Sequence, residues 1–116
     1  MKKEIKVVDI LECLTQQEAT DLARFCLGPS GRTRPGKHFR NELANEGLAM
    51  VDAEGVLRTG QVFDPAEQDI RTGEWKYRLE GHEPGGKWLI IVLCFKSIED
   101  MFLISMFSDK TRRRRP

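Results

Sequence analysis

The stretch of sequence that decides the fold is Trp88-Leu89-Ile90-Ile91-Val92-Leu93-Cys94-Phe95-Lys96. Every residue from 89 to 95 is apolar, which is typical of a strand that is covered on both faces and is therefore central in its sheet. Residues 75–80 alternate instead, so that one side of this second strand is expected to face water. The expected inner side carries Trp75, Tyr77 and Leu79, and the expected outer side carries Lys76, Arg78 and Glu80.

Two more strands are expected near this pair, at residues 61–63 and 101–108. Turn signals at residues 83–86 and 97–100 connect strands as hairpins, whereas residues 64–74 read as a longer acidic loop. The spacing of these segments predicts an antiparallel meander.

A capping box marks the start of a helix, because Thr15 and Glu18 can each satisfy an amide donor left free in a first helical turn. An apolar stripe follows at spacings of three and four residues, formed by Ala19, Leu22, Ala23 and Cys26. Gly28 is expected to end this helix as a left-handed cap, and residues 28–36 are expected to form a loop. Residues 5–11 fit either an edge strand or a short helical turn.

Two shorter helices are expected at residues 37–46 and 52–59. In the second of these, Asp52 is expected to be the N-cap, and Val51 and Val56 are placed for a hydrophobic staple across the cap. The expected buried face of the first is formed by Phe39, Leu43 and Ala44.

Helices that precede strands predict an α+β fold. We expect the N-terminal helices to pack on one face of a twisted, mainly antiparallel sheet of three to four strands. A chain of 116 residues has room for one domain, which we place at residues 1–111. Residues 112–116 are expected to be a basic, disordered tail.

The composition excludes several classes of protein. No apolar run approaches the roughly 20 residues of a membrane-spanning helix, and no secretory signal is evident, so a cytoplasmic protein without a membrane partner is expected. Cys13, Cys26 and Cys94 are odd in number and far apart, which argues against a disulfide framework or a zinc site, and each is expected in the core. His38 and His82 are 44 positions apart, so no metal-ligand spacing is present and no metal is expected. Phosphate-binding glycine motifs are also missing, so no nucleotide cofactor is expected.

The positive charges are concentrated in two places. The 19 Lys and Arg residues become 15 against 18 Asp and Glu once residues 112–115 are set aside, so the body of the chain is mildly acidic. A cluster in residues 28–41 contains no acid, and such clusters either bind phosphate or are simply solvated. The residues expected to bind an anionic substrate are Arg32, Arg34, Lys37, Arg40, Arg112 and Arg113.

Four residues suit metal-free phosphodiester chemistry: His38, Lys76, Tyr77 and Arg78. Such chemistry needs a base, an acid, and cations where negative charge develops on phosphorus. Each residue also has a structural interpretation. His38 fits a residue at a helix start, Lys76 and Arg78 fit a solvated strand face that pairs with acids, and Tyr77 fits a core aromatic.

Three segments carry a resemblance to a known family: Lys37-His38-Phe39-Arg40-Asn41-Glu42-Leu43, Asp52-Ala53-Glu54-Gly55-Val56-Leu57-Arg58-Thr59-Gly60 and Asp69-Ile70-Arg71-Thr72-Gly73-Glu74-Trp75-Lys76-Tyr77-Arg78-Leu79-Glu80-Gly81. Over residues 36–107 the chain resembles a bacterial family of unknown function that is grouped with RelE-like toxins. The resemblance implies a RelE-like fold, an open sheet face that receives RNA or the ribosome, and an antitoxin partner.

The leading hypothesis is a metal-independent endoribonuclease of RelE-like toxin type that acts on mRNA. Lys76 and Arg78 would stabilise the transition state, and His38 or Tyr77 would transfer a proton. The alternative is a non-catalytic module of the same fold that binds nucleic acid or protein. A third possibility is a small structural subunit, monomeric or homodimeric.

Overall fold

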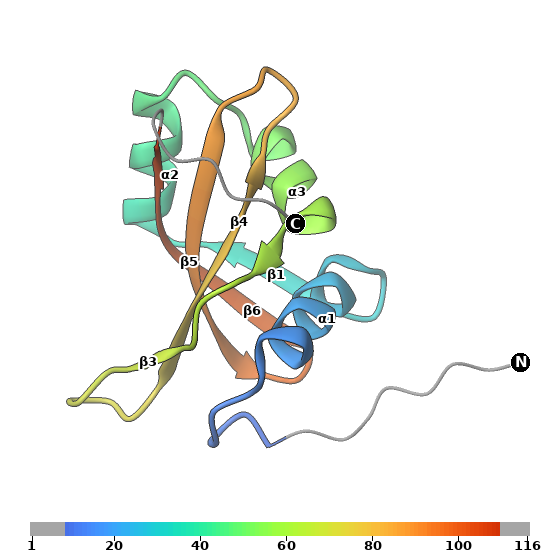
Figure 1. The fold of residues 1–116 in the computed structure, drawn as a ribbon, viewed down its shortest axis with the longest axis vertical. Coiled ribbons are helices and arrows are strands. Elements are labelled where there is room, and N and C mark those ends of the chain that lie inside the picture. Colours follow the sequence, from blue (N-terminus) through green and yellow to red (C-terminus); the bar gives the residue numbers. More distant parts are fainter. Residues whose placement is uncertain (1–8, 110–116) are drawn as a thin grey trace, which may run out of the picture.

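The computed structural model describes residues 9–109, which form three helices on one side of a mixed sheet (Figure 1). Most of residues 5–11 and the whole tail 112–116 lie outside the described part. The predicted α+β class is confirmed. The elements in chain order are α1 (Gln16–Leu27), β1 (Arg32–Pro35), α2 (Lys37–Asn45), α3 (Met50–Thr59), β2 (Gln61–Val62), β3 (Glu67–Gln68), β4 (Trp75–His82), β5 (Trp88–Ser97) and β6 (Asp100–Ser108).

The predicted capping box begins α1. The Thr15 hydroxyl accepts from the backbone nitrogen of Glu18 at 3.1 Å, and the Glu18 carboxylate accepts from the backbone nitrogen of Thr15 at 2.9 Å. The prediction of a left-handed cap at Gly28 is wrong, because this residue has an extended conformation with φ −82°. The chain leaves the helix in this extended conformation and then forms β1.

The two shorter helices are confirmed, with corrections at their ends. Helix α2 buries Phe39 and Leu43, whereas Ala44 faces solvent. Helix α3 starts earlier than predicted, because Asp52 is not the N-cap but reaches back to accept from the backbone nitrogen of Ala49 at 2.8 Å. The predicted staple is wrong, since Val51 is 67% exposed. No helix in the described part is long and apolar enough to cross a membrane.

The sheet has six strands instead of the predicted three to four, in the order β1-β6-β5-β4-β2 with β3 paired to β4. Strands β4, β5 and β6 form the predicted antiparallel meander. Two segments expected to be loops contain strands: β1 in residues 28–36 runs parallel to β6, and β3 in residues 64–74 pairs with β4. Both are short and lack an apolar alternation, so their pairing depends on backbone hydrogen bonds to partners elsewhere.

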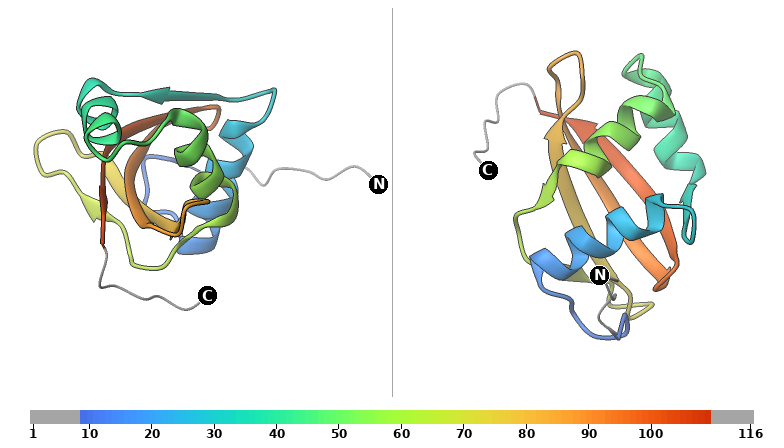
Figure 2. Two further views of the ribbon diagram at one scale, coloured as in Figure 1. Left: turned by 90° about the horizontal axis from the view of Figure 1, so that it is seen from above. Right: turned by 90° about the vertical axis from the view of Figure 1, so that its right-hand side faces the viewer.

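The inner face of the sheet is the face that the helices cover (Figure 2). The side chains of this face form one hydrophobic core with the helices. Within the core, Tyr77 and Leu79 of β4 lie opposite Leu93 and Ile91 of β5. Strand β5 is buried on both faces, as its apolar run predicted. The core also contains Leu22, Cys26, Phe39, Leu43, Val56, Leu57, Leu89, Met101, Leu103 and Met106.

Candidate functional site

The outer face of the sheet, opposite the helices, gathers basic residues from several strands. Lys76 and Arg78 lie on this side, since Tyr77 between them points into the core. Strand β1 lies beside β6 with Arg34 opposite Phe102, so alternate residues of these strands share the same side. The charged and aromatic residues of the outer face that matter below are Arg32, Arg34, Lys76, Arg78, Lys96 and Phe102.

Phe102 lies between two cations of the outer face. The Arg34 guanidinium carbon and the Lys96 ammonium nitrogen are each 5.7 Å from the centroid of its ring. This distance allows a cation–π interaction with each of the two cations. The aromatic ring and the positive charges therefore form one cluster at the β1–β6–β5 part of the sheet.

Both of these cations also have carboxylate partners. Arg34 donates from Nε and Nη2 to the two oxygens of Asp100, each at 2.9 Å, and this bond holds the pKa of Asp100 below its ordinary value. Lys96 donates to Glu74 at 2.6 Å, and this hydrogen bond raises the pKa of Lys96. The two partners fix where the cations lie beside Phe102.

The predicted catalytic cations, Lys76 and Arg78, are paired with acids of the loop that contains β3. The Lys76 ammonium lies 3.3 Å from Asp69, and the Arg78 guanidinium lies 3.7 Å from Glu67. Asp69 accepts hydrogen bonds from the backbone nitrogens of Arg71 and Thr72. These bonds, and to a smaller extent the bond from Lys76, hold the pKa of Asp69 below its ordinary value. Water and salt screen ion pairs at the protein surface, so another anion can replace the carboxylate.

His38 lies on α2 and is separated from Lys76 and Arg78. Its side chain is 69% exposed, and Nε2 lies 3.3 Å from Oε2 of Glu42. The other carboxylate oxygen of Glu42 accepts from the backbone nitrogen of Met106 at 2.8 Å, at the edge of β6. Because β5 lies between β6 and β4, the imidazole is not part of the Lys76–Arg78 cluster.

Tyr77 is a core residue, so its prediction as a proton-transferring residue is corrected. It is only 2% exposed, and its hydroxyl oxygen accepts from the backbone nitrogen of Leu14 at 2.9 Å. Burial raises the pKa of Tyr77. The reason is the alternation of β4, which turns Tyr77 towards the helices while Lys76 and Arg78 point away from them.

The predicted substrate-binding residues fall into separate groups. Arg32 and Arg34 lie on β1, and Lys37 and Arg40 are exposed on α2. Arg112 and Arg113 lie outside the described residues. The basic cluster of residues 28–41 is therefore divided between two surfaces, the outer face of the sheet and the exposed side of α2.

Lys96 and Phe102 are site residues that the sequence did not single out. Phe102 occupies an outward position of the strand expected at residues 101–108, which is the only signal that marked it. Lys96 follows the apolar run and was predicted only as a strand end. Their role depends on the parallel pairing of β1 with β6, which brings Arg34 next to Phe102.

Within residues 9–109 no group of His, Cys, Asp and Glu side chains is arranged to hold a metal ion. Cys26 and Cys94 are buried, as predicted, and burial raises the pKa of both thiols, that of Cys26 to about 12. Cys13 is exposed, so its expected core position is wrong. It precedes α1 and lies outside the apolar stripe of that helix.

Comparisons of the chain with known protein families, with curated proteins and with solved structures give no match. The class defined by the fold is therefore α+β with a mixed sheet, and the resemblance to RelE-like toxins stays a prediction.

Proposed function

We propose that this protein binds single-stranded RNA through the outer face of its sheet. The observation that carries the proposal is that β1, β4 and β5 present five basic side chains on the face opposite the helices, and that two of them, Arg34 and Lys96, each lie 5.7 Å from the centroid of the Phe102 ring. Single-stranded nucleic acid is bound by proteins that combine cations for the phosphates with aromatic rings for the bases. The outer face offers both.

The cations are spread over a width that suits an extended strand. Arg34, Phe102 and Cys94 lie side by side on adjacent strands, and Lys76 comes next in the row, because Tyr77 of β4 pairs with Leu93 of β5. Three strand spacings of about 4.8 Å make this row roughly 14 Å wide. RNA lying across the row would place a base on Phe102 and phosphates at either end.

The local acids limit the expected affinity. Five basic side chains lie among four carboxylates, so the phosphates must displace existing ion pairs. Binding is therefore expected to be salt-sensitive and of moderate strength. If four or five of these cations contact phosphates, the plot of log K against log salt concentration is expected to have a slope of about −3.

Fluorescence anisotropy with a labelled single-stranded RNA, measured at several salt concentrations, tests the proposal. Lys96→Ala and Arg78→Ala are each expected to weaken binding and to flatten the salt slope by about 0.7. Phe102→Leu is expected to remove stacking worth about 1–3 kcal/mol.

Arg58→Ala is the matched control, because Arg58 is exposed on α3, in the helix layer. Its salt slope should equal that of the unmodified chain. The outer face would be rejected as the RNA site if the unmodified chain did not bind RNA at low salt. It would also be rejected if Phe102→Leu and Lys96→Ala bound RNA as tightly as the unmodified chain.

Cleavage of RNA is a second candidate function, which would use the surface of α2 rather than the outer face of the sheet, and the contact between His38 and Glu42 favours it. A carboxylate fixed by the backbone of β6 can orient the imidazole as a general base. Metal-free cleavage that yields a cyclic phosphate and falls by about 10²-fold or more in His38→Ala would support an endoribonuclease. RNA that stays intact while bound would support a binding module alone.

A further inference from the structure

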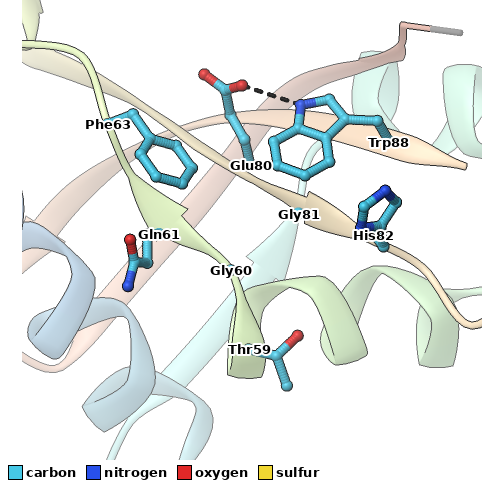
Figure 3. Close-up of a pocket in the computed structure, with 8 residues that line it drawn as sticks. All are labelled: Thr59, Gly60, Gln61, Phe63, Glu80, Gly81, His82 and Trp88. Atoms are coloured by element: carbon cyan, nitrogen blue, oxygen red, sulfur yellow. Dashed lines mark hydrogen bonds between the residues drawn. The ribbon is translucent and has the colours of Figure 1, made fainter. Parts of the chain in front are cut away.

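A pocket of about 320 Å³ lies where β2, β4 and the start of β5 meet (Figure 3). Three of the side chains that line it are aromatic: Phe63, His82 and Trp88. The rings of Phe63 and Trp88 are 6.4 Å apart with 28° between their planes, and His82 meets Trp88 edge-on at 4.8 Å. The volume suits a small ligand group.

A carboxylate completes the lining of this pocket. Glu80 is 1% exposed, and its Oε1 accepts from the indole nitrogen of Trp88 at 3.0 Å. Figure 3 shows the Glu80 side chain between the rings of Phe63 and Trp88. A carboxyl group in such a poorly solvated place interacts more strongly with a group that enters the pocket than it would in water.

The described lining contains no Lys or Arg, so the pocket differs in charge from the basic part of the outer face. Aromatic faces attract cations, and a carboxylate adds to that attraction. A planar cation also stacks on aromatic rings. Guanidinium combines all of these properties.

We propose that this pocket binds a guanidinium group. The inference does not depend on RNA binding, because it concerns a different set of side chains. The group can come from an external molecule or from the chain itself. Asp109, whose backbone nitrogen donates to the carbonyl oxygen of Trp88 at 3.0 Å, is followed within a few residues by the four arginines at 112–115.

Nitrogen-15 NMR of the full chain provides a direct test, because the indole N–H of Trp88 reports on the pocket. The indole N–H of Trp75, the other tryptophan, donates to Leu11 and is an internal reference. Titration with N-acetylarginine amide is expected to shift the Trp88 resonance alone, with a Kd on the order of 1 mM. The neutral isostere N-acetylcitrulline amide is expected to cause no shift.

Two variants identify the groups responsible. Glu80→Gln keeps an acceptor for Trp88 but removes the charge, and is expected to weaken binding about tenfold or more. Glu67→Gln, at an exposed carboxylate of β3, is the matched control and is expected to bind normally. His82→Ala tests the aromatic wall at an exposed residue if Glu80→Gln does not fold.

Equal shifts of both indole resonances, equal binding of the citrulline compound, or unchanged binding by both Glu80→Gln and His82→Ala would overturn the proposal. A full-length variant with serine at residues 112–115 distinguishes the sources. Tighter binding of the added compound by that variant supports the chain's own arginines as competitors, and unchanged binding rejects them in favour of an external ligand.

Discussion

The hydroxyl oxygen of Tyr77 and the backbone nitrogen of Leu14 form a buried hydrogen bond of 2.9 Å between residues 63 positions apart in the sequence. The bond attaches the segment before α1 to the inner face of β4. Tyr77 also packs against Phe95, with ring centroids 5.6 Å apart. These contacts give the hydroxyl a structural role.

Tyr77→Phe is therefore expected to destabilise the fold without affecting RNA binding. The substitution leaves the Leu14 N–H without its acceptor in a buried place, which costs about 1–3 kcal/mol. Urea denaturation measures the loss, and anisotropy measures RNA affinity in the same preparation. Weaker RNA binding with unchanged stability would instead return Tyr77 to the functional site.

Thr20 predicts a second stability effect. Its hydroxyl accepts from the backbone nitrogen of Val62 at 3.0 Å and donates to the carbonyl of Gln16 at 2.8 Å. Thr20→Val keeps the shape but removes both bonds, and about 1–3 kcal/mol of stability should be lost. Thr20→Ser retains the hydroxyl and should be nearer to the unmodified chain in urea denaturation. Equal stability of all three proteins would contradict this role.

The pairing of Asp100 with Arg34 predicts a dependence of stability on pH. Because the hydrogen bond from Arg34 lowers the pKa of Asp100 below its ordinary value of 3.8, the unfolded chain takes up the proton first as pH falls. The stabilisation is thus present above that value and is lost as the pH falls through the lower pKa of the folded state.

Asp100→Asn tests this sign. The variant should be less stable than the unmodified chain at neutral pH, and the difference should shrink as the pH is lowered below 3.8. Denaturation curves recorded across that range measure it. A difference that stays constant with pH would show that the ion pair does not contribute through the charge of Asp100.

The three thiols are expected to react at different rates. Cys13 is exposed, whereas Cys26 and Cys94 are buried with raised pKa values, which keep them protonated at mildly alkaline pH. Ellman's reagent should therefore modify one thiol rapidly in the native chain and all three after unfolding. Cys13→Ser should abolish the rapid phase, and a rapid phase that survives this substitution would contradict the burial of the other two.

The sequence predicted the elements whose signals are local. The capping box at Thr15, the apolar run of β5 and the alternation of β4 depend on residues close together in the chain, and the structure contains all three. Strand β1 could not be predicted in this way, because its pairing is with residues 100–103 of β6. Backbone pairing between distant segments leaves no periodicity in either one.

The candidate site shows the same limit. The alternation of β4 correctly placed Lys76 and Arg78 on one side, and it also placed Tyr77 on the other. It could not show that Glu80, on the polar side, would be buried against Trp88, because that contact depends on hairpin geometry. The sequence also could not predict that Arg34 lies beside Phe102, because that contact depends on the pairing of β1 with β6.

The interior position of β6 has a consequence for synthesis of the chain. This strand is the last to be made among the described elements, yet it lies between β1 and β5 and supports α2. Arg34 precedes its partner Asp100 by 66 residues, which is roughly 3 to 13 seconds of translation. During that interval the apolar side chains of α2 lack the strand that covers them in the folded chain, so packing of α2 has to wait until β6 has been made.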